Sequence, residues 1–344
     1  MVTVARIVLL PIPCIFLIYG GDIGIWLAFI LYTLLGATDF VDGAMARREG
    51  PTKLGALIDP VADKIFVASI CLALVVIKVM PAWALMAVLL RELFITALRT
   101  SVASRDESIR TSRLAKVKTI VQMGGFGTIF LTVTLTPFYA TVVGAVLCLG
   151  LIAFYCIYWA IKKKHPPFWV IPVASSFLFW MLISIYFTKE LSVLSQLVVI
   201  VSLTWISCFD YVVGTYKMFL RTGINIKDWI RLYWAAAHTL LAAPLVALYP
   251  ELVLPLLASI SFELALGGID TVVASDQKYA GISPFFVTSI VATIVSALVF
   301  ANYQGWLAVN IVALSLILAF VSVAVCSLTY AKWKFLFKSV LTKQ

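Results

Sequence analysis

The feature that most limits what this chain can fold into is a series of long apolar stretches with few charges. Twelve stretches of roughly 18 to 25 residues follow one another, each long enough to cross a bilayer as a helix. They centre near residues 4–20, 24–46, 57–78, 81–102, 115–137, 138–161, 168–188, 194–217, 229–249, 252–274, 281–302 and 306–330. Hydrophobic residues make up 63% of the chain and charged residues 12%, whereas a soluble domain is about half apolar and a quarter charged. The sequence therefore predicts an all-α, polytopic membrane bundle of about twelve transmembrane helices.

The distribution of basic residues predicts how these helices are oriented. With the N-terminus inside, the external side receives only Lys78 and Lys189 of the 26 Lys and Arg residues. Both termini are therefore expected in the cytoplasm. The formal net charge of +10 indicates topology and affinity for anionic lipid headgroups, and no aromatic–basic pattern of a nucleic-acid binder interrupts the stretches. We expect a multi-pass protein of the cytoplasmic (inner) membrane that contacts membrane lipid and binds no nucleic acid.

Four aspartates within 25 residues stand out against this apolar background, because an acid in or near a membrane is costly and is rarely present without a role. The pattern is Asp39-x-x-Asp42-Gly43-x-x-Ala46-Arg47, then Gly55-x-x-x-Asp59-x-x-x-Asp63. The first pair shares one helix face, and the second pair lies one turn apart on another helix, whose start is marked by Asp59-Pro60. Solvated helix-end acids would explain each aspartate but not the shared faces. Converging carboxylates repel one another unless cations hold them, so we expect a divalent metal site at the cytoplasmic membrane surface.

This motif resembles that of the CDP-alcohol phosphatidyltransferases, which join an alcohol to a phosphatidyl group and release CMP. The resemblance implies catalytic roles for Asp63, as general base, and for Asp59. It also implies two Mg²⁺ or Mn²⁺ ions held by all four aspartates of the motif, Asp39, Asp42, Asp59 and Asp63. Gly43, Ala46, Arg47 and Gly55 would line the pocket for CDP. Arg47 is equally suited to anchor the topology, and the two roles can coexist.

Further stretches are similar to bacterial phosphatidylglycerophosphate synthases: Thr3-x-x-Arg6, then residues 91–99 and 116–123. The usual upstream Ile-Pro-Asn segment is missing, so we expect any amphipathic anchor before the first stretch to be absent or much reduced. CDP-diacylglycerol and glycerol 3-phosphate are the substrates that this resemblance implies. Inositol phosphate, or phosphatidylglycerol as in a cardiolipin synthase, are the alternative acceptors.

An anionic acceptor needs cations. Candidate phosphate-binding residues near the cytoplasmic ends of the fourth and fifth stretches are Arg99, Lys116 and Lys118, and both lysines are equally suited as topology anchors. Supporting roles are expected for Arg6, Arg91, Glu92 and Gln122. Because adjacent residues on a helix do not face each other, Arg91 and Glu92 should each pair with a group on another span.

The resemblance is firm over residues 1–135, and family members usually have fewer spans. Residues 207–211 read Ser-Cys-Phe-Asp-Tyr, which looks like the family's closing helix. We therefore expect a catalytic bundle over 1–221 with a two-span insertion at 138–188, and an appended four-span unit over 222–344. Alternatively, the bundle closes near residue 164, or residues 210–214 are a degenerate copy of 39–43.

Polar residues also occur beyond the motif: Asp210, His238, Glu263 and Asp270. Hydrogen bonding between helices is their expected use, and a second lipid, ion or partner site is the alternative. The resemblance implies a homodimer unless the extra helices cover or replace its interface. A hypothesis of another class is a non-catalytic membrane transporter or scaffold, but the intact set of aspartates argues against it.

Overall fold

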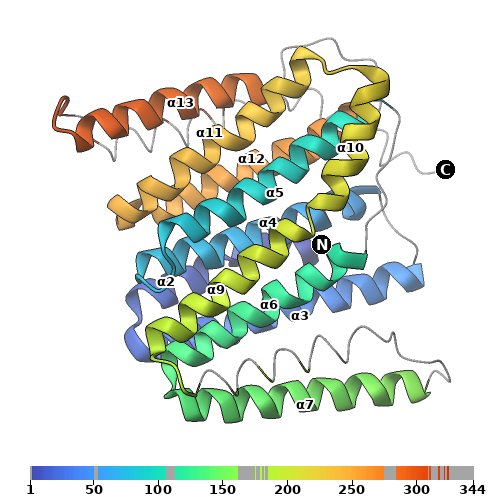
Figure 1. Ribbon diagram of the computed structural model, residues 1–344, viewed down its shortest axis with the longest axis vertical. Coiled ribbons are helices and arrows are strands. Elements are labelled where there is room, and N and C mark those ends of the chain that lie inside the picture. The colour runs from blue at the N-terminus through green and yellow to red at the C-terminus, as the bar shows by residue number, and fades with distance from the viewer. Residues whose placement is uncertain are drawn as a thin grey trace.

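The computed structural model of the chain describes residues 2–49, 53–105, 113–161, 185–274 and 284–308, with isolated residues elsewhere. The regular elements within these ranges are helices, which confirms the predicted all-α class (Figure 1). In chain order they are α1 (Val2–Leu9), α2 (Pro11–Tyr19), α3 (Gly21–Glu49), α4 (Lys53–Val76), α5 (Ala82–Ala103), α6 (Arg113–Thr134), α7 (Pro137–Ile161), α9 (Lys189–Ile206), α10 (Phe209–Thr222), α11 (Ile226–Leu248), the 3-10 turn η1 (Pro250–Leu252), α12 (Val253–Ala274) and α13 (Pro284–Tyr303).

The first predicted stretch, 4–20, is not one helix. It divides at Leu10 into α1 and α2, with Pro11 and Pro13 in the first turn of α2. Proline lacks an N–H and is tolerated in the first turn, where no intrahelical acceptor is needed, but it disrupts the interior of a helix. The two prolines therefore mark a helix start that the apolar pattern alone conceals.

The stretch 194–217 is also divided, at Ser207 and Cys208, into α9 and α10. The Ser207 hydroxyl donates to the carbonyl of Thr204 at 2.7 Å and accepts from Arg91 at 3.0 Å. Serine that bonds its own backbone competes with regular helix geometry, and here a second helix stabilises the break. The stretches 168–188 and 306–330 lie mostly outside the described residues.

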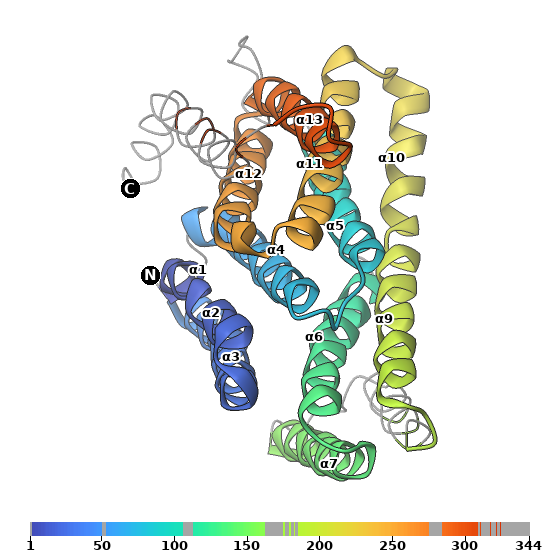
Figure 2. The same cartoon turned by 90° about the vertical axis from the view of Figure 1, so that its left-hand side faces the viewer.

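The helices α4 and α5 lie at the centre of the bundle, and α11 and α12 from the C-terminal part of the chain pack against them (Figures 1 and 2). Small buried residues line these contacts, among them Ala68, Ala84, Ala235 and Ala242. In lipid, apolar surface alone does not drive helices together, and small side chains stabilise an interface by letting backbones approach closely. The largest side chain of this core is Trp234 of α11, which is completely buried and donates to Glu263 of α12.

An ion pair closes the same interface at the C-terminal end of α5. Arg105 follows α5 and donates to both carboxylate oxygens of Asp228, at 3.1 and 2.6 Å. It also donates to the carbonyls of Ser101 and Gly223. Asp228 accepts from the backbone N–H of Asn225 at 2.9 Å, and so completes a capping box at the start of α11. The end of α5 is thus fixed to the start of α11.

A second layer, formed by α6, α9 and α7, lies beside this core (Figure 2). The amide of Gln196 on α9 accepts from Thr128 at 3.0 Å and donates to Thr132 at 3.1 Å, both on α6. Gly125 allows the same two helices to approach, because a Cβ there would lie 2.5 Å from Cδ1 of Ile200. Polar side chains and a glycine together join α6 to α9.

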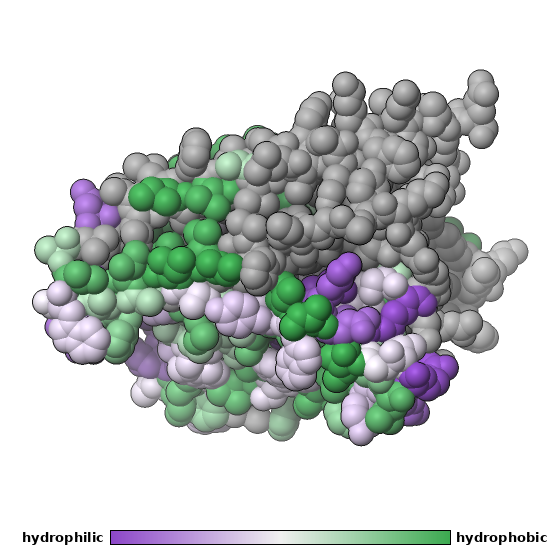
Figure 3. Space-filling model, turned by 90° about the horizontal axis from the view of Figure 1, so that it is seen from above, coloured by the Kyte–Doolittle hydropathy of each residue, from purple (hydrophilic) through white to green (hydrophobic). Residues whose placement is uncertain are grey.

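Four of the described helical segments are long and apolar enough to cross a membrane: Gly21–Thr38, Lys189–Thr222, Ile226–Leu248 and Pro250–Gly268. Many large apolar side chains are exposed on the outside of the bundle, for example Ile23, Leu34 and Ile294. Figure 3 shows broad apolar areas at the left of one face and hydrophilic residues gathered toward the right. This distribution indicates a membrane protein. The twelve spans and the cytoplasmic termini remain predictions.

Candidate active site

The second aspartate pair of the motif lies on α4. Asp59 and Asp63 are one helical turn apart and partly buried. Arg6 of α1 is almost fully buried and places its Nη1 3.4 Å from Oδ1 of Asp63, whose side chain remains 44% exposed. Asp63 is therefore held by a cation and still accessible. The predicted helix start at Asp59-Pro60 is wrong, because α4 begins at Lys53 and Pro60 lies inside it.

The first aspartate pair, Asp39 and Asp42, lies on the C-terminal part of α3. For these two residues the structure describes the backbone but not the side chains. The level of their backbone follows from the packing of α3 against α4. A Cβ on Gly36 would lie 3.6 Å from the Phe66 ring, and the rings of Phe66 and Tyr32 are 5.6 Å apart.

The two helices run in opposite directions (Figure 1). Asp39 is three residues after Gly36, and Asp63 is three residues before Phe66, so the two positions stand at the same level of an antiparallel pair. Asp42 and Asp59 follow about one turn further on. The backbone thus brings all four motif positions to one end of the α3–α4 pair.

The residues present fit a divalent cation in their chemistry. Carboxylate oxygens are the ligands that Mg²⁺ and Mn²⁺ prefer, and the two motif aspartates with described side chains are one turn apart on one face of α4. Within the described part of the chain, no group of three or more His, Cys, Asp or Glu side chains forms a candidate metal site. Of the four motif aspartates, only Asp59 and Asp63 have side chains within that part.

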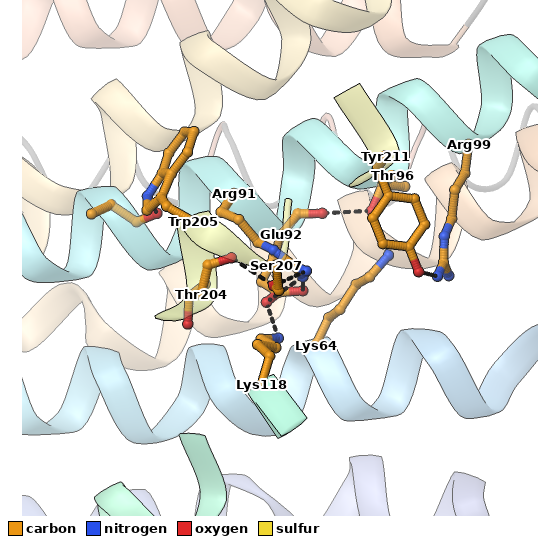
Figure 4. Close-up of polar contacts among 11 residues, drawn as sticks. Lys64, Arg91, Glu92, Thr96, Arg99, Lys118, Thr204, Trp205, Ser207 and Tyr211 are labelled. Atoms are coloured by element: carbon orange, nitrogen blue, oxygen red, sulfur yellow. Dashed lines mark hydrogen bonds and ion pairs between the residues drawn. The ribbon is translucent and has the colours of Figure 1, made fainter. Parts of the chain in front are cut away.

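A buried cluster of charges lies beside α4, centred on Glu92 of α5 (Figure 4). Arg91 donates to both oxygens of Glu92, at 3.1 and 3.2 Å, and Lys118 of α6 donates to Oε1 at 2.5 Å. Arg91 also donates to Ser207 at the end of α9. The expected contacts with other spans are therefore present. The expectation that Arg91 and Glu92 do not meet is wrong, because the long guanidinium side chain reaches the carboxylate of the next residue.

Two further cations of the cluster have hydroxyl partners. Lys64, directly after Asp63 on α4, donates to Oγ1 of Thr96 at 2.5 Å. Arg99 donates to the hydroxyl of Tyr211 at 2.9 Å, and its guanidinium lies 5.2 Å from the centre of that ring. The helix α5 thus carries Arg91, Glu92, Thr96 and Arg99 along one side of the site.

Lys118, a predicted phosphate ligand, is buried and bound to Glu92, while Arg99 is partly exposed. Gln122 is fully buried one turn after Lys118. For the remaining predicted site residues the structure describes no side-chain environment: Gly43, Ala46, Arg47, Gly55, Lys116, Asp210 and Asp270. Sequence reasoning missed Lys64 and Thr96, although the position of Lys64 next to Asp63 was a usable signal.

Two members of the proposed second site meet between α11 and α12. His238 places Nε2 3.5 Å from Oε1 of Glu263, and Trp234 donates to Oε2 of Glu263 at 3.0 Å. Nδ1 of His238 lies 3.0 Å from the carbonyl oxygen of Trp234. All three side chains are buried, in agreement with hydrogen bonding between helices.

An all-helical bundle with this acid motif defines the class of protein. Residues 1–154 match the sequence profile of the CDP-alcohol phosphatidyltransferase family. The chain belongs to the CDP-alcohol phosphatidyltransferase family, a family of transferases of phospholipid biosynthesis.

Among curated proteins, the chain is similar to the CDP-diacylglycerol–glycerol-3-phosphate 3-phosphatidyltransferase of Bacillus subtilis, with 35% identity over 135 residues, which cover 36% of this chain and 70% of that protein. The enzyme of the same name from Cereibacter sphaeroides is 35% identical over 137 residues, 38% of this chain and 61% of the relative. A probable phosphatidylglycerophosphate synthase of Mycobacterium tuberculosis is 35% identical over 129 residues, 36% of this chain and 61% of the relative. No solved structure matches the chain.

Proposed function

We propose that this enzyme transfers a phosphatidyl group from CDP-diacylglycerol to glycerol 3-phosphate, releasing CMP and forming phosphatidylglycerophosphate. The observation that carries the proposal is the family match over residues 1–154, which includes the complete acid motif. The relatives named above support glycerol 3-phosphate as the acceptor. The cations beside α4 agree with an anionic acceptor.

Asp39, Asp42, Asp59 and Asp63 would hold two divalent ions, Mg²⁺ or Mn²⁺. When bound, the ions would supply positive charge that neutralises the pyrophosphate and stabilises the departing CMP. The support from the structure is the common level of the four motif positions on α3 and α4. Gly43, Ala46, Arg47 and Gly55 belong to the same two helices and would line the CDP pocket.

Asp63 is the proposed general base. In the reaction, the acceptor oxygen forms a bond to the phosphorus that carries diacylglycerol, the bond from that phosphorus to the CMP oxygen breaks, and the hydroxyl proton passes to Asp63. Arg6, with Nη1 3.4 Å from Oδ1, orients this carboxylate toward the site. The exposed part of Asp63 leaves room for the acceptor hydroxyl. Asp59 assists as its neighbour one turn away.

The acceptor phosphate would bind to cations at the cytoplasmic ends of α5 and α6, for which Arg99, Lys116 and Lys118 were the sequence candidates. Arg99 fits this role because it is partly exposed. Lys118 fits less well, since Glu92 neutralises it and it is buried. Arg91, Glu92 and Gln122 would support the site from the interior of the bundle.

We further propose a multi-pass topology in the cytoplasmic membrane, with about twelve spans, both termini in the cytoplasm and the active site at the cytoplasmic face. Residues 1–221 would form the catalytic bundle, with an insertion at 138–188, and residues 222–344 an appended unit. Contacts of Ser207 with Arg91 and of Tyr211 with Arg99 support the inclusion of α9 and α10 in that bundle. We also propose a homodimer, which measurement of the protein's mass in detergent tests.

The test is CMP release by purified protein in micelles that contain CDP-diacylglycerol, with Mg²⁺ or Mn²⁺. Release that requires both metal and glycerol 3-phosphate is the expected result. Release with inositol phosphate or phosphatidylglycerol, but not with glycerol 3-phosphate, would keep the reaction type and change the acceptor. Folded protein that releases no CMP with any acceptor would contradict the proposal and favour a transporter or scaffold.

A further inference from the structure

The cations around the site differ in how they are neutralised. Glu92 is shared by Arg91 and Lys118, at 3.1 and 2.5 Å. Arg105 is matched by Asp228. Lys64 and Arg99 differ, because among the described residues neither has a carboxylate within ion-pair distance. Lys64 and Arg99 thus have neutral hydroxyl partners, from Thr96 and Tyr211, in place of a carboxylate.

Both of these cations are near the reacting end of the site. Lys64 directly follows Asp63, and its ammonium group reaches α5 at Thr96, one turn before Arg99. Both side chains are partly exposed, unlike those of Glu92 and Lys118. Figure 4 shows Lys64 extending toward Thr96, with Arg99 and Tyr211 next to it. Neighbouring cations that solvent can reach form a site for an anion.

Uncharged hydroxyl groups hold both cations in place. Tyr211 is 1% exposed, its ring lies against the guanidinium of Arg99, and its hydroxyl accepts one of five N–H donors. Thr96 is itself fixed, because its hydroxyl donates to the carbonyl of Glu92 at 2.8 Å. Tyr211 lies on α10, beyond residues 1–154 that match the family.

We propose that Lys64 and Arg99 together bind the phosphate group of the acceptor, and that Tyr211 is a positioning residue that directs Arg99 toward it. This inference rests on the proposed function. A guanidinium offers paired donors to phosphate oxygens, and an ammonium adds a point charge from the opposite helix. The site would therefore select a phosphorylated alcohol over a neutral one, and would include a residue from α10.

The experiment compares steady-state kinetics of the wild-type protein with Lys64→Gln, Arg99→Lys and Tyr211→Phe. We expect KM for glycerol 3-phosphate to rise about tenfold or more in the first two variants, as for the loss of a charge-assisted hydrogen bond. Tyr211→Phe retains the ring but loses the accepting oxygen, so KM should rise about three- to tenfold. KM for CDP-diacylglycerol should stay within about twofold in all three variants, because its binding does not use these donors. The inhibition constant of inorganic phosphate, measured against glycerol 3-phosphate, should weaken in parallel.

Lys217→Gln is the matched control, because Lys217 is an exposed cation on the same helix as Tyr211, and its kinetics should equal those of the wild type. Unchanged KM for glycerol 3-phosphate in Lys64→Gln and Arg99→Lys, with an active wild type, would overturn this assignment alone. Equal rises of KM for both substrates in Tyr211→Phe would indicate a merely structural role and would overturn the positioning role. Wild-type protein that uses only a neutral alcohol would overturn both the proposed function and this inference.

Discussion

Arg105 and Asp228 form a two-point ion pair that joins the end of α5 to the start of α11, with N–O distances of 3.1 and 2.6 Å. Asp228 is almost fully buried, and Nη1 and Nη2 of Arg105 also donate to the backbone carbonyls of Ser101 and Gly223. Planar, paired hydrogen bonds of this kind fix orientation as well as distance. The pair therefore determines where the end of α5 lies, and α5 carries Arg99.

The first prediction concerns this pair. In a double-mutant cycle with Arg105→Met and Asp228→Asn, we expect a coupling energy of about 1.5 to 3 kcal/mol, because the two side chains contact each other directly. The measurement is the free energy of unfolding in detergent, followed by helical circular dichroism. Lys227→Met, at an exposed neighbour of Asp228, should change the free energy of unfolding by less than about 0.5 kcal/mol. Additive effects of the two variants would show that the ion pair contributes no coupling.

The second prediction concerns the acid motif. Asp59→Ala should abolish CMP release while the protein stays folded, because one of the proposed metal ligands is lost. Asp22→Ala provides the control, since Asp22 is exposed at the other end of α3. Both variants are assayed for CMP release and for thermal unfolding. Turnover retained in Asp59→Ala would exclude the metal-site assignment.

The third prediction concerns metal removal. Protein treated with EDTA and freed of chelator should release no CMP, and Mg²⁺ or Mn²⁺ should restore release, because hard oxygen ligands bind these ions reversibly. Stability provides a second measurement, since an ion that binds only the folded protein raises its melting temperature. Asp59→Ala should show a smaller rise than the wild type. Full activity after chelation would contradict a divalent metal requirement.

The fourth prediction concerns the buried charges. Glu92→Gln leaves Arg91 and Lys118 buried without their shared carboxylate, so we expect a loss of roughly 3 to 5 kcal/mol in the free energy of unfolding. Glu190→Gln, at an exposed position in the first turn of α9, removes an acid without leaving buried cations unpaired. It should not change the free energy of unfolding. A Glu92→Gln variant as stable as the control would mean that the cluster does not stabilise the fold.

The fifth prediction tests the α6–α9 contact. Gly125→Ala should destabilise the protein by about 1 to 3 kcal/mol, because the added methyl would overlap the buried, branched side chain of Ile200. Gly127→Ala should be tolerated, since a Cβ there would meet Phe29 at an ordinary 3.9 Å. Ile200→Ala in the Gly125→Ala background should recover part of the loss. The measurement is the free energy of unfolding of these variants. Equal effects of the two glycine changes would contradict a close contact between Gly125 and Ile200.

The all-α class could be predicted from the long apolar stretches, but the stretches 4–20 and 194–217 are each divided into two helices, which the apolar pattern does not reveal. It could not predict which helices pack together, since lipid-facing and protein-facing sides are both apolar. The contact of α11 and α12 with α4 and α5 was therefore missed. The acid motif was found because charges in such a chain are rare. The partners of Lys64 and Arg99 were missed because threonine and tyrosine hydroxyls occur throughout the chain and give no local signal.

Two predictions about local structure were wrong. Pro60 suggested a helix start, but α4 already begins at Lys53, so the carbonyl of Ala56 has no N–H from Pro60 to accept. Arg91 and Glu92 were expected to diverge, but side-chain length outweighs the angle between adjacent helix positions. The rule that proline starts a helix did not hold at Pro60. The rule that adjacent helix residues do not meet did not hold for the long side chain of Arg91.

The packing of α11 and α12 on α4 and α5 has a consequence for how the protein is made. A ribosome adds about 5 to 20 residues per second, so α4 and α5 are made many seconds before α11 is complete. During that interval the faces of α4 and α5 that later pack against α11 and α12 must contact lipid or another protein. Assembly of the bundle is thus completed only near the end of synthesis, and premature termination would leave the reacting helices without their final partners.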